Sequence, residues 1–315
     1  DVYKRQTRRL AGRVPGHGVH ACTSFFPRLM DKNEIDWIFQ IDDEEVLETY
    51  RTRDNYLIEH SPEGDGSRCA VYFSSNDLYF PNNRARFHER VTRRNTFEWF
   101  GTRIPGCGRH IFIRDVFKQW YLGGINARLN SPEKVLEWLK EETRGCRVTM
   151  MGSSAGGYAA VLFGSLLHAE RVFSFNGYFD LAPETDMENA AVVNPLLVRY
   201  RNDVQRAPFY RLAPFLRERT PVYYFHSLFS PIDRRQRELL GNHQGVHVIP
   251  FRSSRHGIPF LKCCLNRIFQ YSDEKLLALC GTEHHPVRFS LRCAGVWETA
   301  AGFSRQVWQH YRKRH

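Results

Sequence analysis

The 315-residue chain is predicted to form one large α/β domain, in which a mostly parallel central sheet lies between two layers of helices. Two observations support this fold class. Strand-like and helical segments alternate along most of the chain, which is the pattern of parallel sheets. Hydrophobic residues make up 42% of the sequence and aromatic residues 14%, which is enough to build a substantial core.

The first expected elements lie between residues 55 and 145. Segments 55–60 and 69–74 are strand-like, and a Pro-Glu-Gly-Asp-Gly turn connects them, so we expect an antiparallel pair. The next expected strand is 110–114. A helix is predicted to begin at Ser131, with a proline in its first turn, and to end near Gly145.

The second half of the chain continues the alternation. Further strands are expected at 147–151, 171–175, 221–226 and 246–251. The segment from about 178 to 219 loses strand character and is rich in Arg, Pro and aromatic residues, so a helical lid is expected there. The α/β domain is predicted to span 35–271, with a basic helical C-terminal appendage at 272–315.

The first residues are expected to come from a sequencing adapter. Residues 2–6 read VYKRQ, which is the translation of a common transposon sequencing adapter, and the chain does not begin with Met. Residues 1–6 are therefore expected to be a sequencing scar and are excluded from the fold. Residues 7–34 are expected to form a basic N-terminal segment.

An apolar run from Val148 ends in Gly-Ser-Ser-Ala-Gly at 152–156 and continues as a helix of small residues. This is the strand, tight turn and helix of a nucleophile elbow, which presents Ser154 above the sheet edge. The turn crowds the backbone, so glycine is needed at positions such as Gly152 and Gly156. The alternatives are a plain strand-to-helix turn and a phosphate-binding loop, but the G-x-x-x-x-G-K pattern of the latter is missing.

A serine hydroxyl becomes a good nucleophile when a histidine accepts its proton and a carboxylate orients that histidine. In a parallel sheet, these groups emerge at the carboxyl ends of strands. Asp233 is expected in the loop after strand 221–226, and His256 in the loop after strand 246–251. The chain order after the elbow is therefore acid and then histidine. Ser154, Asp233 and His256 are the predicted catalytic residues.

Each of these residues also has an alternative interpretation. Asp233 precedes a helical segment and is of a type that caps helices. His256 has the alternative of an ordinary loop histidine. Asp180, which follows strand 171–175, is the rival acid, and His226 is expected to belong to the core.

A tetrahedral intermediate needs two hydrogen-bond donors for its oxyanion, and backbone amides serve well because they are fixed in place. The first predicted donor is the amide of Ala155, directly after the nucleophile. The second is expected from the loop after an early strand, and Ser75 is the candidate there.

Over residues 55–271, the contexts of Ser154, Asp233 and His256 resemble those of the α/β-hydrolase superfamily. The blocks RD and QWY within 114–121, GSSAGGY at 152–158 and FSFN at 173–176 resemble bacterial hydrolase-like proteins associated with capsule and surface-polysaccharide biosynthesis. The resemblance implies a three-layer α/β-hydrolase-like sandwich with an inserted lid. It also implies a serine esterase or acyltransferase that forms an acyl-enzyme. The implied substrate is a small-molecule or glycan ester, or a lipid-linked precursor.

A different class of function remains open. The chain is also compatible with a non-catalytic accessory protein of a glycan-assembly system, which retains the hydrolase fold as a binding platform. The intact serine, acid and histidine argue for the enzyme.

Composition narrows the partners. The net charge is +11, but the chain ends supply eight of these charges, and basic tails usually stay solvated, so no specific nucleic-acid binding is expected. The eight cysteines show no C-x-x-C pairing and no histidines at zinc spacing, which indicates reduced thiols of a cytoplasmic protein. We expect no cofactor, no metal and no transmembrane helix, and the oligomeric state is open.

Overall fold

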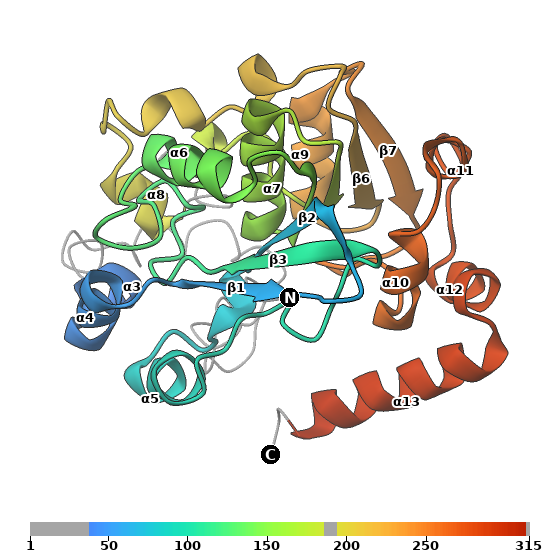
Figure 1. Ribbon diagram of the computed structural model, residues 1–315, viewed down its shortest axis with the longest axis horizontal. Helices are drawn as coiled ribbons and strands as arrows, with labels where there is room; N and C mark the ends of the chain where they lie inside the picture. Colours follow the sequence, from blue (N-terminus) through green and yellow to red (C-terminus); the bar gives the residue numbers. More distant parts are fainter. Residues whose placement is uncertain (1–37, 186–193, 313–315) are drawn as a thin grey trace, which may run out of the picture.

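The computed structural model describes residues 38–185 and 194–312 (Figure 1). Within them, a seven-stranded sheet has the order β1-β3-β2-β4-β5-β6-β7. Its neighbouring strands are parallel except for the pair β1–β3, so the predicted mostly parallel sheet is confirmed. The strands are β1 (Tyr56–His60), β2 (Asp65–Phe73), β3 (Cys107–Ile113), β4 (Arg147–Ser153), β5 (Arg171–Phe175), β6 (Val222–Ser227) and β7 (Val246–Phe251).

The predicted antiparallel pairing of the first two strands is wrong. β1 pairs antiparallel with β3, with Tyr56 opposite Ile113, and β3 separates β1 from β2. Burial explains the order. Residues 69–73 at the end of β2 are all buried, as in a central parallel strand, whereas β1 is partly exposed and lies at the sheet edge. The turn between β1 and β2 therefore connects strands that are close in sequence but are not paired.

Helices lie on both sides of the sheet. Successive residues of a strand point to opposite faces. Met150 accordingly packs in the cluster that includes α7, whereas Met151 packs in the cluster that includes α10 and α12. The predicted three-layer arrangement is therefore confirmed. The main helices are α3 (Phe39–Asp42), α4 (Glu44–Thr52), α5 (Arg84–Phe87), α6 (Pro132–Glu142), α7 (Ala155–Leu167), α8 (Pro195–Arg199), α9 (Pro231–Leu240), α10 (Leu265–Ile268), α11 (Asp273–Leu277), α12 (Pro286–Ala294) and α13 (Val296–Arg312).

The helix predicted from Ser131 is present as α6. Ser131 is its N-cap, and the Ser131 hydroxyl accepts a hydrogen bond from the Lys134 amide at 3.4 Å. The helix ends at Glu142, three residues before Gly145. Start and stop signals in the sequence therefore located this element well.

The segment predicted as a lid is built of short pieces where it is described. Residues 182–185 and 207–209 form 3-10 turns, and α8 lies between them. The segment is anchored on α7, because the Tyr158 hydroxyl donates to the carbonyl of Phe209 at 2.5 Å. Its role as a lid stays a proposal, and residues 186–193 lie outside the described part of the chain.

The predicted scar at 1–6 and the basic segment at 7–34 also lie outside the described residues. Of the cysteines, Cys22 falls in this part, and the seven that the structure describes are free thiols. None of the described helices combines the length and the apolar character that crossing a bilayer requires.

Candidate active site

Ser154 stands at the turn between β4 and α7, in a backbone conformation that is rare for residues other than glycine. Its φ is +56° and its ψ is −120°. The turn is held from both sides, because the Ser154 amide donates to the Phe175 carbonyl at 3.0 Å and the Ser154 carbonyl accepts from the Tyr158 amide at 3.0 Å. The hydroxyl is therefore presented from a fixed and strained position.

The glycines that flank Ser154 are required by close backbone contacts. A Cβ atom on Gly152 would lie 2.1 Å from the carbonyl oxygen of Gly156, and one on Gly156 would lie 2.2 Å from that of Phe73. Both distances are far shorter than a carbon–oxygen contact allows. The pattern read from the sequence thus has a direct steric cause.

Gly156→Ala is therefore expected to destabilise the protein, whereas Gly101→Ala is not. Nothing lies within 4 Å of a Cβ atom on Gly101, which makes it the matched control. The overpacked Gly156→Ala variant should lose about 1–3 kcal/mol of unfolding free energy. Urea unfolding of both variants measures this. Equal midpoints for the two would contradict the steric explanation.

The prediction that Asp233 lies in a loop is wrong. The residue lies in the first turn of α9. Pro231 follows the strand end closely and begins the helix at once. Ser230 is the N-cap, and its hydroxyl accepts from the Asp233 amide at 3.5 Å. The Asp233 side chain is left free to face the sheet edge.

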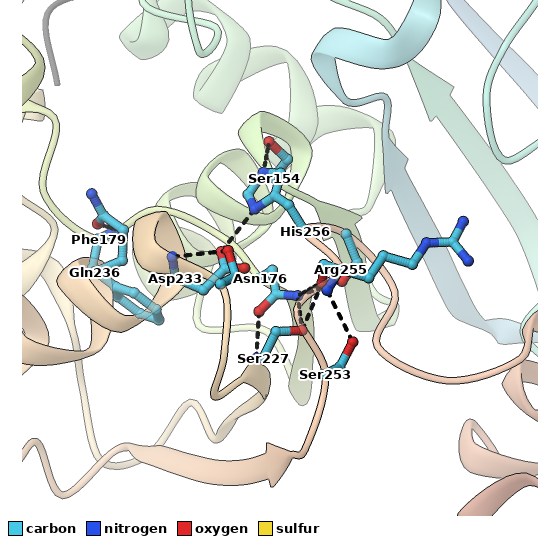
Figure 2. A network of polar contacts seen from close by, with 11 residues as sticks. Ser154, Asn176, Phe179, Ser227, Asp233, Gln236, Ser253, Arg255 and His256 are labelled. Atoms are coloured by element: carbon cyan, nitrogen blue, oxygen red, sulfur yellow. Dashed lines mark hydrogen bonds and ion pairs between the residues drawn. The ribbon is translucent and has the colours of Figure 1, made fainter. Parts of the chain in front are cut away.

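The three predicted catalytic side chains meet at the carboxyl end of the sheet (Figure 2). His256 Nδ1 lies 2.7 Å from Asp233 Oδ1, and His256 Nε2 lies 2.8 Å from Ser154 Oγ. With the proton on Nδ1, the imidazole donates to the carboxylate and accepts from the serine hydroxyl. The side chains come from α9, the loop after β7 and the elbow, so the fold brings together what the chain separates.

Two buried acids lie near His256. Asp233 is completely buried, and its Oδ2 accepts no hydrogen bond from the described residues. A buried carboxylate is costly unless it is paired, and the hydrogen bond from His256 Nδ1 provides a partner for Oδ1. A second acid, Glu184, is also buried nearby. Burial raises the pKa of Glu184 to about 7, while Arg235 and His256 act to lower it. The sequence carried no signal for Glu184.

Asn176, directly after β5, ties the histidine loop to the sheet (Figure 2). Its Nδ2 donates to the carbonyls of Gly257 at 2.6 Å and Arg255 at 3.2 Å, on both sides of His256, and to Ser227 Oγ at 2.8 Å. Its Oδ1 accepts from the Ser227 amide at 2.8 Å. Asn176 is fully buried and has a φ of +47°, a left-handed conformation that Asn tolerates. Sequence reasoning did not assign this function, and an Asn-Gly pair just after a strand was its only local signal.

Gln236 makes a second connection, between α9 and the start of the predicted lid. Its side-chain oxygen accepts from the amides of Phe179 at 2.8 Å and Asp180 at 3.0 Å, and its Nε2 donates to the Asp180 carbonyl at 2.9 Å. Gln236 lies nearly one helical turn after Asp233. The helix that carries the acid therefore also holds the base of the lid segment.

The rival residues are engaged elsewhere. Asp180 Oδ2 lies 3.3 Å from Arg211 Nε, and Asp180 Oδ1 accepts from the amide of Ala182. His226 is buried in β6 with its ring against Tyr224, and burial lowers its pKa. Its expected place in the core is confirmed.

The first predicted oxyanion donor is well placed. Ala155 begins α7, and the first amides of a helix have no partner within the helix. The second candidate lies at the same sheet edge, because Phe73 of β2 pairs with Gly152 of β4. Ser75 and Ser154 are thus each two residues beyond a register pair.

However, the amide of Ser75 already has an acceptor. It donates to Glu98 Oε2 at 2.5 Å. The same segment is fastened by two further bonds, from Trp99 Nε1 to the Phe73 carbonyl at 2.8 Å and from the Glu98 amide to Ser74 Oγ at 3.4 Å. Burial raises the pKa of Glu98, while Lys262 acts to lower it. The amide predicted as the second oxyanion donor is thus bonded to a carboxylate oxygen.

The strand order and the position of the serine after β4 decide the fold. The chain has the α/β-hydrolase fold. The resemblance noted in the sequence is confirmed at this level. Searches against family models and curated proteins found no match.

Several solved structures are similar to the chain. The capsule O-acetyltransferase of Neisseria meningitidis serogroup A is 11% identical with a TM-score of 0.43, over 65% of this chain and 89% of that chain. Acetyl xylan esterase 1 from Thermoanaerobacterium is 9% identical with a TM-score of 0.44, over 71% of this chain and 78% of that chain. The Wnt deacylase Notum from Drosophila is 18% identical with a TM-score of 0.39, over 64% of this chain and 80% of that chain. At these TM-scores, the similarity assigns neither a family nor a substrate to the chain.

Metal chemistry has no candidate centre in the described part of the chain. No group of three or more His, Cys, Asp or Glu side chains there is arranged to hold a metal ion. The side chains that meet at the sheet edge are a serine, a histidine and a carboxylate, which are the residue types that acyl transfer uses.

Proposed function

We propose that the protein is a serine esterase or acyltransferase that forms an acyl-enzyme on Ser154. One observation carries this proposal. Asp233, His256 and Ser154 form a continuous chain of hydrogen bonds at 2.7 and 2.8 Å, and the serine stands on a strained elbow.

The proposed reaction uses this geometry. Ser154 Oγ attacks the ester carbonyl carbon while its proton moves to His256 Nε2. When the tetrahedral intermediate collapses, the bond to the alcohol breaks, and His256 returns the proton to the leaving oxygen. Water or a second alcohol then attacks the acyl carbon while His256 takes its proton, the bond from that carbon to Ser154 Oγ breaks, and His256 returns the proton to Ser154. Throughout, Asp233 holds the imidazole in the required tautomer.

The oxyanion would bind to the amides of Ala155 and Ser75. The first is available at the start of α7, and the second becomes available when the Glu98 carboxylate moves away. Lys262 could pair with the displaced Glu98 carboxylate, because its positive charge already acts to lower the pKa of Glu98. The proposed hole is therefore completed during binding.

The proposed substrate is an ester of a small molecule or an acylated glycan, including lipid-linked precursors. The resemblance of residues 152–158 and 173–176 to bacterial capsule-associated proteins supports this class. The proposed setting is the cytoplasm. Whether water or a sugar hydroxyl accepts the acyl group depends on how well the segment 178–219 excludes water.

Labelling with a fluorescent fluorophosphonate tests the proposal, because the probe reacts with activated serines. Wild-type protein is expected to be labelled, and Ser154→Ala is expected to remain unlabelled. Ser153→Ala is the matched control, since it removes the neighbouring hydroxyl and should keep the labelling. Labelling of Ser154→Ala at the wild-type rate would exclude Ser154 as the nucleophile.

The second candidate function is a non-catalytic hydrolase-like accessory protein of glycan assembly. The observation that favours it is the hydrogen bond from the Ser75 amide to Glu98, which occupies a proposed oxyanion donor. A folded wild-type protein that no fluorophosphonate labels would support this candidate over the enzyme.

A further inference from the structure

The last described helix, α13, packs on the rest of the molecule with small and polar side chains. Thr299 and Gly302 are its buried residues in the region where side chains are described. A Cβ atom on Gly302 would lie 2.9 Å from the sulfur of Cys263, so the helix backbone approaches the domain closely here. In Figure 1, α13 runs along the margin of the molecule, next to α12.

The large apolar side chains described on α13 are exposed. Trp297 is 89% exposed, and Val296, Phe303 and Trp308 are each more than half exposed. With 3.6 residues per turn, Trp297 and Trp308 lie on the side of the helix opposite Thr299 and Gly302, and Val296 and Phe303 flank the buried arc. A surface helix normally buries its apolar stripe and exposes its polar one. In α13, the described residues show the reverse.

The adjoining sequence is strongly basic. Helix α12 adds exposed apolar side chains at Val287 and Leu291, and exposed arginines at 288 and 292. Glu298 is the only acidic residue between positions 286 and 315. The basic residues of this range are Arg288, Arg292, Arg305, Arg312, Lys313 and Arg314.

We propose that the α12–α13 surface binds the face of a membrane that carries anionic lipids. Tryptophan and phenylalanine side chains insert at the boundary between headgroups and acyl chains, and arginines interact with anionic headgroups. A helix that combines both features lies in the plane of the interface. It does not span the bilayer, which agrees with the helix lengths of the described chain.

A second copy of the chain fits this surface less well. In a two-fold symmetric contact, each patch faces its own equivalent, so the excess of positive charge would face itself. An anionic lipid surface complements that charge and accommodates exposed indole rings. Charge therefore selects the lipid surface.

Co-sedimentation with vesicles tests the proposal. The protein is expected to bind vesicles of phosphatidylcholine and phosphatidylglycerol, but not phosphatidylcholine alone, and binding should weaken as salt is added. Trp297→Ala combined with Phe303→Ala should weaken binding by about tenfold or more, because both large apolar contacts are lost. Phe229→Ala is the matched control, since Phe229 is an exposed aromatic residue between β6 and α9. Its binding should equal that of the wild type.

If the double variant does not fold, the tryptophan fluorescence of the wild-type protein provides an independent test. Its tryptophan emission should shift to shorter wavelength when phosphatidylglycerol vesicles are added. Absence of both binding and shift would overturn the proposal. The proposal would also be overturned if the wild-type protein did not bind vesicles but formed a concentration-dependent dimer in sedimentation velocity, and the double variant did not form this dimer. These measurements do not depend on esterase activity, so their outcome is independent of the proposed function.

Discussion

Replacing Ser154 or His256 by alanine should each lower kcat/KM for an activated ester by about 10⁶-fold, and replacing both should lower it no further. The two side chains share a hydrogen bond of 2.8 Å and act on the same proton, so losing either one removes the activated nucleophile. Steady-state hydrolysis of a p-nitrophenyl ester, measured for both single variants and the double variant, tests this.

Ser153→Ala serves as the control for the hydroxyl, because Ser153 precedes the nucleophile at the end of β4. It should keep activity within a small factor of the wild type. Circular dichroism confirms that each variant is folded. If the double variant were slower than the wild type by the product of the two single losses, the residues would act independently. The proposed shared proton transfer would then be wrong.

Asp233→Asn should lower kcat by about 10⁴-fold while leaving the fold intact. The carboxylate fixes the proton of His256 on Nδ1 across 2.7 Å. An amide nitrogen in its place donates toward Nδ1 and favours the tautomer with the proton on Nε2, which cannot accept the serine proton. The replacement has the same shape as the fully buried aspartate, so the midpoint of thermal unfolding should change little. The large effect should be on kcat.

Asp180→Asn is the comparison that distinguishes the two acids considered from the sequence. Asp180 forms an ion pair with Arg211, whose side chain is largely exposed, so its loss should change kcat by less than about tenfold. A larger loss of kcat for Asp180→Asn than for Asp233→Asn would transfer the role of the acid to Asp180.

The parts of the site that were predictable depend on local chemistry. The Gly-Ser-Ser-Ala-Gly turn has a steric cause within five residues, so the position of Ser154 could be read directly. Asp233 and His256 could be placed because the carboxyl ends of parallel strands share one edge of a sheet. The strand 246–251 matched β7 at both ends. The error at Asp233 was local as well, since a proline two residues earlier begins α9 at once.

The parts that were missed depend on contacts between distant segments. Asn176 bonds to residues 51 to 81 positions away, and no spacing in the sequence announces this. The bond from Ser75 to Glu98 likewise joins two loops that only the folded sheet brings together. The pairing of β1 failed because adjacency in sequence suggested a hairpin, whereas the apolar character of β2 required a central position.

Asn176 gives the molecule a common anchor for two parts with different tasks. Asn176 donates to the carbonyls on both sides of His256, and the segment predicted as a lid begins two residues later, where Gln236 of α9 accepts from the amides of residues 179 and 180. A movement of the predicted lid would therefore reach His256 through the side-chain amide of Asn176. It would reach Asp233 through α9. Closure over a substrate and alignment of the proton relay would then be a single mechanical event.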